Sequence, residues 1–355
     1  MDIVALVVGA SGIAGRGVSQ ELVSLGARVY GLSRRPEGIV GGVEHVAADL
    51  LDDASLRSAL SEVRPTHVYI TTWSRRATEK ENIDVNAGTV RRLLATLSPS
   101  RSVKHVALVT GLKHYLGPFD AYARSGTLPL TPVREEHPRL DVPNFYYNQE
   151  DELYAAAKRD GFTWSVHRPH TIIGKAIGNA MNMGSTLAAY ASICKETRRP
   201  MTFPGSAAQW NGLTDMTDAR VLGKHLVWAS TTDRAKNEAY NIVNGDIFRW
   251  NWMWPRLARW FGIDWVGFEG EPKPLEAQMA EDAPIWRRMV EQYGLVESRL
   301  DRVASPWHTD LDLGRPLEVM TDMAVSRKLG FLVYQNTQEA FLELFATLRA
   351  DKIIP

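Results

Sequence analysis

The feature that most constrains the fold is a glycine-rich turn placed directly after an apolar run. Residues 4–8 read Val-Ala-Leu-Val-Val, and Gly9, Gly12 and Gly15 follow at intervals of three. A continuous apolar run of this length is typical of a strand buried on both faces of a parallel sheet. Glycines permit a tight turn and a close approach to a pyrophosphate, which the next helix N-terminus binds. This order predicts a dinucleotide-binding unit; the alternative is an ordinary glycine-rich turn.

Short β-branched runs alternate with helix-length segments over the first 170 residues. The expected strands are residues 3–8, 28–33, 45–47, 67–71, 106–110 and 163–167, and the expected helices include 15–25, 54–63 and 85–97. Such alternation predicts an α/β fold with a Rossmann-type, doubly wound parallel sheet. After about residue 175 the alternation fades, although 218–230 has a helical pattern and 239–243 a strand pattern.

We therefore expect two lobes. Residues 1–175 form an NADP-binding Rossmann domain, to which segments near 210–246 return, and residues 176–355 form a smaller, mainly helical substrate-binding lobe. The length of 355 residues agrees with this division, since a domain usually has about 100–200 residues.

Five tryptophans between residues 250 and 265 share a short stretch with arginines. The i, i+4 spacing of Trp250 and Trp254 favours a core-facing helix stripe over a surface that stacks on nucleic-acid bases.

Charge and cysteine content exclude several classes of protein. The 41 basic side chains balance 41 acidic ones, whereas nucleic-acid-binding proteins usually carry a basic excess, so neither nucleic acid nor a membrane is expected as a partner. No apolar run approaches the roughly 20 residues that cross a bilayer. Cys194 is the only cysteine, so the chain has no internal disulfide, and a cytoplasmic location is expected. The spacing of the histidines indicates no metal site. The N-terminal run lacks the basic region of a signal peptide.

The end of the second expected strand indicates which dinucleotide binds. Enzymes that use NAD usually carry an acidic residue here for the ribose 2′-hydroxyl, whereas arginine favours the 2′-phosphate of NADP. This chain has Ser33, Arg34 and Arg35, and guanidinium groups match phosphate oxygens in geometry and charge. We therefore predict NADPH as the cofactor; the alternative is a solvated basic turn.

Two tyrosine–lysine pairs compete for the catalytic role. Short-chain dehydrogenases/reductases, which the Gly9–Gly15 spacing resembles, usually carry Tyr-x-x-x-Lys on the helix after the fifth strand, and Tyr154 and Lys158 have this spacing. That helix is expected to begin near residue 145, with its N-terminus facing the cofactor. Tyr154 lies eight residues beyond Tyr146, about 12 Å along the helix at 1.5 Å per residue. We interpret Tyr154 and Lys158 as a pair on the helix surface.

Lys113 and Tyr146 are better placed. Lys113 follows the fifth strand and Tyr146 opens the crossover helix, so both are expected at the carboxyl edge of the sheet. A lysine ammonium favours the ionised form of a nearby phenol, which helps that phenol to stabilise a developing oxyanion. Glu150 stands four residues after Tyr146, where lysine is usual, so the lysine is expected to arrive from a loop.

These motifs resemble the progesterone 5β-reductase/iridoid synthase family of atypical short-chain reductases. The resemblance runs from about residue 4 to at least residue 265. Its most specific motifs are Thr-Gly-Leu-Lys-His-Tyr-Leu-Gly-Pro-Phe at 110–119 and Asn-Phe-Tyr-Tyr at 144–147. Further matches lie at 164–169, 191–195, 236–241 and 244–246. It implies that NADPH reduces the C=C bond of an activated enone. Hydride is delivered to the β-carbon while Tyr146, helped by Lys113, stabilises the enolate oxygen.

The resemblance also implies the residues that line the site. Cofactor contacts are expected from Gly9, Ser11, Gly12, Ile13, Gly15, Ser33, Arg34, Arg35, Asp49, Leu50, Thr71, Thr110, Tyr146, Pro169 and Ile172. Substrate contacts are expected from Trp73, Tyr115, Phe119, Tyr146, His170 and Met181. Asp49 resembles an adenine contact, and its alternative role is to cap the following helix.

The expected partner is a small hydrophobic enone: a steroid 4-en-3-one, a monoterpenoid or a smaller enone or enal. Residues 117–143 and 174–183 differ from the plant members of the family, so the specificity of those members does not transfer. Two alternatives remain open: a carbonyl/alcohol oxidoreductase or sugar-nucleotide epimerase that uses Tyr154 and Lys158, and an NADP-sensing protein without turnover. The sequence leaves room for a homodimer.

Overall fold

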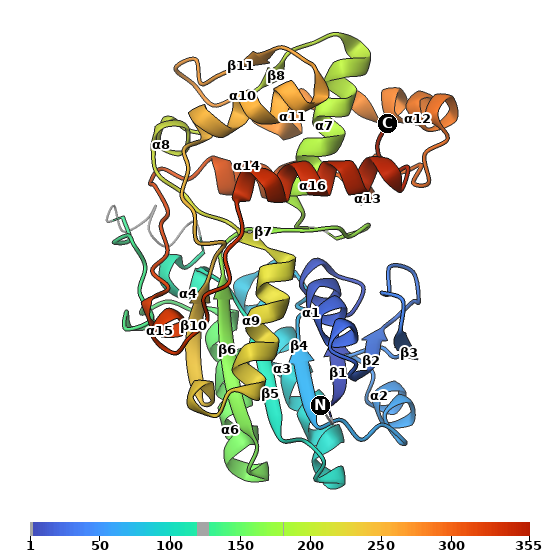
Figure 1. Ribbon diagram of the computed structural model, residues 1–355, viewed down its shortest axis with the longest axis vertical. Helices are drawn as coiled ribbons and strands as arrows, with labels where there is room; N and C mark the ends of the chain where they lie inside the picture. Colours follow the sequence, from blue (N-terminus) through green and yellow to red (C-terminus); the bar gives the residue numbers. More distant parts are fainter. Residues whose placement is uncertain (1–2, 119–127, 180) are drawn as a thin grey trace. The chain divides into compact units, whose positions relative to one another are not determined.

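The computed structural model describes residues 3–118, 128–179 and 181–355 (Figure 1). The chain divides into two compact units, each built from three segments. The first unit takes Met1–His170, Ala219–Ile242 and Asp322–Val333, and the second takes Thr171–Asp218, Val243–Thr321 and Tyr334–Pro355. The first unit therefore ends at His170 where the sequence suggested residue 175, and its returning segment begins at Ala219 where the sequence suggested about residue 210.

The third segment of the first unit, Asp322–Val333, has no counterpart in the boundaries expected from the sequence. Its helix α15 (Ala324–Lys328) contacts strand β10 (Glu238–Ile242). The Phe331 ring lies edge-on to the His225 imidazole at 4.6 Å between centroids. Aromatic packing between residues about a hundred positions apart holds this segment on the first unit, and no local sequence pattern signals it.

A seven-stranded parallel sheet forms the centre of the first unit. The strand order is β10-β6-β5-β4-β1-β2-β3, and every neighbouring pair is parallel. Besides β10, the strands are β1 (Val4–Val8), β2 (Arg28–Ser33), β3 (Val43–Ala47), β4 (His67–Ile70), β5 (His105–Val109) and β6 (Thr163–Pro169). This topology confirms the predicted Rossmann-type sheet, whose order reverses at β1 and whose ligands bind beyond the carboxyl ends of the strands.

Helices cover both faces of this sheet. Alternate strand residues such as Leu6, Val68 and Leu108 pack into one apolar cluster with helix residues such as Val90 and Leu153. On the other face, the Tyr69 hydroxyl hydrogen-bonds the Ser230 hydroxyl of α9 at 2.8 Å. The remaining helices of this unit are α1 (Ile13–Ser24), α2 (Asp53–Ala59), α3 (Glu79–Leu97), α4 (Lys113–Leu116), α6 (Phe145–Asp160) and α9 (Ala219–Thr231), with 3-10 turns at Ser98–Ser100 and Asp233–Ala235.

Helix α3 begins six residues earlier than the sequence analysis expected. Thr78 and Glu81 form a capping box, in which the Thr78 side chain accepts from the Glu81 amide and the Glu81 carboxylate accepts from the Thr78 amide. This reciprocal capping satisfies two backbone donors and fixes the helix start at Glu79. The earlier start matters for the site, because it brings Glu79 to the N-terminus of α6.

The second unit is mainly helical, as predicted. Its longest helices are α7 (Met183–Thr197), α10 (Trp250–Phe261), α12 (Asp282–Tyr293) and α16 (Thr337–Ala350); shorter ones are α8 (Ala207–Asn211), α11 (Leu275–Gln278), α13 (Leu300–Val303) and α14 (Pro306–Leu313). Two small parallel sheets pair β7 (Ile172–Ile173) with β9 (Thr217–Asp218), and β8 (Met201–Thr202) with β11 (Trp265–Val266). Trp250 and Trp254 are fully buried in the core of this unit, which confirms the core-facing stripe, while Trp252 and Trp265 are exposed.

Three histidines of the first unit form a buried hydrogen-bonded chain. Ser165 bridges His105 and His167 at 3.0 and 2.8 Å, and the Nδ1 atom of His167 lies 2.8 Å from Nδ1 of His225. These contacts account for the three imidazoles as structural groups. Within residues 3–118, 128–179 and 181–355, no group of three or more His, Cys, Asp or Glu side chains is arranged to hold a metal ion. No helix over the same residues has the length and apolar character needed to cross a membrane.

Candidate active site

The glycine turn forms a close-packed cradle between β1 and α1. Gly9 has a φ of 85°, and a Cβ atom there would lie 2.7 Å from Cβ of Thr72. A Cβ atom at Gly15 would lie 2.1 Å from the Gly9 carbonyl oxygen, so only glycine lets the helix start this close to the strand. Gly12 is the N-cap of α1, no side chain caps this end, and its first turn holds no acidic residue. Its amide groups and the positive end of the helix dipole therefore fit a dinucleotide pyrophosphate.

The turn after β2 lies next to this cradle. The amide groups of Gly9 and Ala10 donate to the Leu32 carbonyl at 3.0 and 3.4 Å. The Ser33 hydroxyl donates to the Arg35 carbonyl at 2.6 Å, which fixes the turn. Arg34 and Arg35 are both exposed, so their guanidinium groups are accessible to an anionic ligand. Two exposed guanidinium groups therefore stand at the turn where the sequence analysis expected a phosphate group to bind.

A further arginine approaches the same turn. The Arg16 side chain, in the first turns of α1, donates a hydrogen bond to the Gly38 carbonyl. Sequence reasoning missed Arg16. The signal available was a basic residue directly after the glycine turn, on the helix whose N-terminus is expected to bind an anion.

Residues at the ends of β3, β4 and β5 lie where the sequence placed them, at the carboxyl edge. The Asp49 carboxylate accepts from the Leu51 amide at 2.9 Å, and helix α2 is capped by Asp52, which accepts from Ala54 and Ser55. The alternative in which Asp49 caps α2 is therefore wrong. The Thr71 hydroxyl donates to the Val8 carbonyl at 2.8 Å, and the Thr110 amide donates to the His167 carbonyl at 2.8 Å.

Helix α6 begins at Phe145, as predicted, and places Tyr146 in its first turn. The Phe145 amide donates to the Glu79 carboxylate at 2.7 Å, and the Tyr146 amide donates to the Asn144 side chain at 3.1 Å. A Cβ atom at Gly111 would lie 3.4 Å from the Tyr146 hydroxyl and 3.4 Å from the Pro169 carbonyl oxygen. The Tyr146 hydroxyl therefore lies against the chain just beyond β5, at the edge of the sheet where ligands bind.

Burial raises the pKa of Tyr146 above its usual value, and the Glu79 carboxylate raises it further. The phenol is therefore protonated at neutral pH, which corrects the expectation that its ionised form is favoured. A protonated phenol is a hydrogen-bond donor, so Tyr146 is suited to stabilise an oxyanion that develops on a substrate. Glu79 was missed by sequence reasoning, and the capping box at Thr78 and Glu81 was the signal that would have found it.

An aromatic surface brings Lys113 to the start of α6. The Lys113 ammonium lies 5.2 Å from the centre of the Trp73 ring and 5.6 Å from that of Phe145. Trp73 and Phe145 stack at 4.8 Å, and the Phe145 ring is 4.3 Å from that of Tyr146. A cation within about 6 Å of an aromatic face is attracted to it. Lys113 and Tyr146 thus share one aromatic cluster, and Lys113 opens the short helix α4 where the sequence analysis expected a loop.

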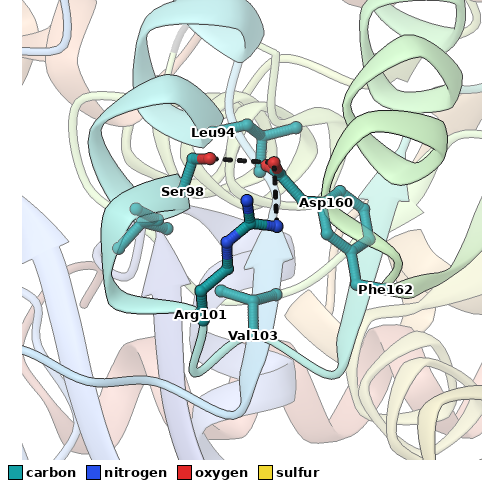
Figure 2. A pocket seen from close by; sticks show the side chains of 7 residues that line it. Leu94, Ser98, Arg101, Val103, Asp160 and Phe162 are labelled. Atoms are coloured by element: carbon teal, nitrogen blue, oxygen red, sulfur yellow. Dashed lines mark hydrogen bonds and ion pairs between the residues drawn. The ribbon is translucent and has the colours of Figure 1, made fainter.

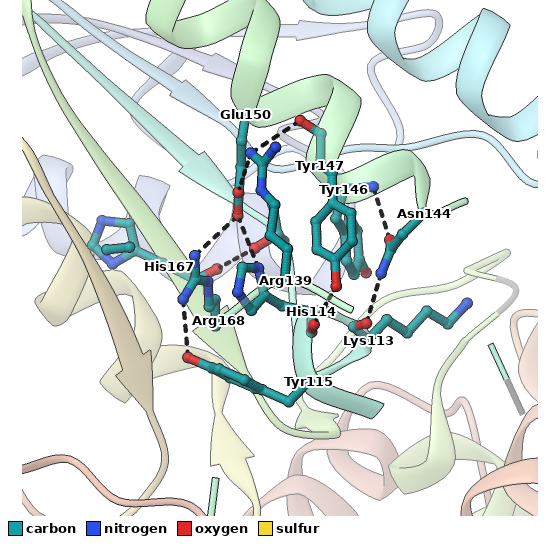
Figure 3. Close-up of polar contacts among 12 residues, drawn as sticks. Lys113, His114, Tyr115, Arg139, Asn144, Tyr146, Tyr147, Glu150, His167 and Arg168 are labelled. Atoms are coloured by element: carbon teal, nitrogen blue, oxygen red, sulfur yellow. Dashed lines mark hydrogen bonds and ion pairs between the residues drawn. The ribbon is translucent and has the colours of Figure 1, made fainter. Parts of the chain in front are cut away.

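Glu150, which replaces the usual lysine, lies in a buried charge network (Figure 3). Its carboxylate accepts from Arg139 at 2.8 Å and from Arg168 at 3.3 Å, and Nδ1 of His114 is 3.5 Å away. Burial alone would raise the pKa of Glu150, but His114, Arg168 and Arg139 outweigh burial, and its pKa is lowered. Glu150 is therefore an ionised structural anchor of α4, α6 and β6.

The residues that were expected to contact substrate differ in burial and in the unit of the chain to which they belong. Tyr115 is buried, and its hydroxyl donates to Asn241 at 2.8 Å and accepts from Arg168 at 3.0 Å. These bonds hold the Tyr115 hydroxyl in place, and its expected contact with substrate stays a prediction. Phe119 lies outside the described residues. His170 is buried at the end of the first unit, whereas Met181 belongs to the second unit, in the loop before α7. Ile172, an expected cofactor contact, lies in β7 of the second unit.

Tyr154 and Lys158 lie well down helix α6. The Tyr154 ring packs on the Trp164 ring at 4.5 Å, and Lys158 is exposed. This placement agrees with the interpretation of the pair as a structural feature of the helix.

Figure 2 shows a small pocket near the end of α6, where Asp160 accepts from Ser98 at 2.8 Å and lies 3.8 Å from Arg101. Its residues precede β5 and β6, at the amino ends of the strands, opposite the edge that holds Tyr146.

Comparisons with known proteins agree with this arrangement. The (S)-8-oxocitronellyl enol synthase of Nepeta cataria is 37% identical, covering 99% of this chain and 93% of that protein. The 3-oxo-Delta(4,5)-steroid 5-beta-reductase of Arabidopsis thaliana is also 37% identical, with the same coverage. Among solved structures, the UDP-glucose 4-epimerase of Thermotoga maritima has a TM-score of 0.70 at 14% identity and covers 98% of both chains, which shows the fold alone. The PRISE-like Rossmann-fold domain matches residues 38–355, and the chain belongs to that family.

Proposed function

We propose that the protein is an NADPH-dependent reductase of the C=C bond of an activated enone. The observation that carries the proposal is the pairing of Tyr146 and Lys113 on one aromatic cluster at the carboxyl edge of the sheet. The relatives named above are an enol synthase and a steroid 5-beta-reductase, which supports the same reaction class here. The alternative that uses Tyr154 and Lys158 lacks support, because Tyr154 packs against Trp164 far from this edge.

The cradle at Gly9–Gly15 would hold the pyrophosphate, and Arg34 and Arg35 would hold the 2′-phosphate. When bound, NADPH supplies the hydride that reduces the β-carbon of the enone. The protein's part is to stabilise the negative charge that then develops on the carbonyl oxygen. Tyr146 donates a hydrogen bond from its protonated hydroxyl to that oxygen, and the Lys113 ammonium adds a positive charge beside it. A pre-oriented donor in a buried site costs no reorganisation at the moment of reaction.

The proposed substrate is a small hydrophobic enone. The half-buried Trp73 ring, which stacks on the buried Phe145 ring, presents apolar surface beside Lys113, and this suits a carbon skeleton with one polar carbonyl. The proposal includes a cytoplasmic location, which the single, buried and unpaired Cys194 supports, since a reducing compartment keeps thiols free.

A comparison of matched carbonyl compounds tests the proposal. The purified protein should oxidise NADPH at least tenfold faster with 2-cyclohexenone than with cyclohexanone, because only the enone can accept hydride at a β-carbon. Absorbance of NADPH at saturating cofactor measures both rates. The proposal would be contradicted if only the saturated ketone were turned over. It would also be contradicted if the protein reduced neither of these two compounds nor any member of a panel of cyclic and open-chain enones and enals.

A further inference from the structure

One buried side chain joins the backbones of the two proposed catalytic residues. The Asn144 amide nitrogen donates to the Lys113 carbonyl at 2.6 Å, and its amide oxygen accepts from the Tyr146 amide at 3.1 Å (Figure 3). Asn144 is 2% exposed, so water does not compete for either bond. The carboxamide thus links the first residue of α4 to the first turn of α6, two positions that are 33 residues apart in the chain.

The two partners also fix the chemistry that this position requires. The Lys113 carbonyl accepts from the Gly117 amide at 3.0 Å and takes a second donor from Asn144, whereas the Tyr146 amide needs an acceptor. A carboxamide supplies both a donor and an acceptor from one planar group. Aspartate and serine are helix N-caps as good as asparagine, so capping alone does not require asparagine. An aspartate would keep the bond to the Tyr146 amide but has no hydrogen with which to reach the Lys113 carbonyl.

A second clamp acts on the next residue of α4. The Tyr147 hydroxyl donates to the His114 carbonyl at 2.5 Å and accepts from the Leu140 amide at 3.0 Å. Its ring is held independently, edge-on to the His114 ring at 5.2 Å and under the Arg139 guanidinium at 4.9 Å. Two consecutive carbonyls of the four-residue helix that carries Lys113 are therefore bonded to side chains from the start of α6.

We propose that Asn144 is a positioning residue for the reaction, which sets the Lys113 ammonium relative to the Tyr146 hydroxyl, and that Tyr147 is a second positioning residue for the same lysine. Neither is expected to touch the substrate. The inference rests on the proposed function, because it assigns these residues an effect on the chemistry that Lys113 supports. Misplacement by about 1 Å can cost a hundredfold in rate, so loss of either clamp is expected to lower the rate of the chemical step.

The direct test is Asn144→Asp, with Asn148→Asp as the matched control. Asn148 lies one turn further along α6, and the control adds the same charge to the same helix without touching either clamp. Asn144→Asp should lower kcat with 2-cyclohexenone about 10- to 100-fold and leave the KM for NADPH within about twofold, because the cap is kept and only the donor is lost. Asn148→Asp should retain wild-type kcat. A primary isotope effect on kcat with deuterated NADPH should increase in Asn144→Asp, since the chemical step becomes slower.

A second pair of variants keeps the test independent of how well the aspartate is tolerated. Tyr147→Phe removes only a hydroxyl, and Tyr154→Phe is its control on the same helix. Tyr147→Phe should lower kcat about 5- to 50-fold, whereas Tyr154→Phe should not, with melting temperatures within a few degrees of wild type for both.

The variants are then combined with Lys113→Ala to show through which residue they act. Both Asn144→Asp and Tyr147→Phe should lose most of their effect on kcat when Lys113 is already alanine, because they act through that lysine. Equal fold-losses in the presence and absence of Lys113, or wild-type kcat in both single variants, would overturn the inference while leaving the proposed function intact. A wild-type protein that reduces no enone is the different result that overturns the proposed function.

Discussion

Replacement of Tyr146 by phenylalanine is expected to lower kcat for enone reduction about 100- to 1,000-fold, the usual cost of removing one oxyanion donor. The ring should keep its place, since it packs on Phe145 at 4.3 Å, so only the hydroxyl is lost. The KM for NADPH should change little, because the cradle and the Ser33–Arg35 turn are untouched. Steady-state kinetics with 2-cyclohexenone measures both constants.

Tyr154→Phe is the matched control, because it removes a tyrosine hydroxyl two turns further along the same helix. It should keep wild-type kcat. The opposite pattern, with Tyr154→Phe inactive and Tyr146→Phe active, would contradict the site and favour the pair at Tyr154 and Lys158.

The dependence on pH provides a second check on Tyr146. Burial and the Glu79 carboxylate raise its pKa above the ordinary value of about 10. The hydroxyl therefore stays protonated, and able to donate, as pH rises from 7 to 9. The kcat of the wild type should therefore not fall through ionisation of this tyrosine between pH 7 and 9. A fall in kcat centred near pH 8 in the wild type, absent from Tyr146→Phe, would show that the phenol ionises in this range.

The second large effect is expected at the turn after β2. Arg34→Ala/Arg35→Ala should raise the KM for NADPH about 100-fold, since each charge-assisted hydrogen bond to the phosphate contributes about 1.5–3 kcal/mol. The KM for NADH should rise less than threefold, because NADH lacks the 2′-phosphate. Initial rates with each cofactor at saturating enone give both values.

Arg28→Ala is the control for this double variant. Arg28 begins β2 at the opposite edge of the sheet and pairs with Glu44 at 2.8 Å in an exposed ion pair, which contributes little to stability. It should leave both KM values unchanged. Similar increases for NADPH and NADH in Arg34→Ala/Arg35→Ala would contradict a role in binding the 2′-phosphate.

The sequence predicted the parts of the fold that depend on local pattern. Strand β2 matches its expected bounds at Arg28–Ser33, and helix α6 begins at Phe145, near the start expected at residues 145–146, with Asn144 as its N-cap. Both follow from local rules: a β-branched run between turn residues reads as a strand, and asparagine before an aromatic-rich periodic segment reads as a helix start.

The rest depends on contacts between residues distant in sequence. Asp322–Val333 joins the first unit through packing of Phe331 on His225, which no local pattern reveals. The sequence did not indicate the partners of Tyr115, whose hydroxyl is bonded to Asn241 and Arg168, 126 and 53 residues away. The protonated state of Tyr146 likewise follows from burial and from Glu79, whose proximity depends on the start of α3.

Glu150 shows how the family pattern changes the role of a position. Four residues after Tyr146 the usual short-chain reductase would have a catalytic lysine, and here a buried carboxylate binds Arg139 and Arg168. The same carboxylate lies 3.5 Å from His114 in α4, the helix whose first residue is Lys113. Glutamate at the usual lysine position therefore helps to anchor the helix that carries the lysine of this site.

The most direct measurement of the central claim locates the transferred hydride. The protein is incubated with 2-cyclohexenone and NADPH that carries deuterium on the transferable position of the nicotinamide, and the product is examined by NMR and mass spectrometry. The account predicts cyclohexanone with one deuterium at the β-carbon. Deuterium on the carbinol carbon of 2-cyclohexenol would show reduction of the carbonyl group and would contradict it.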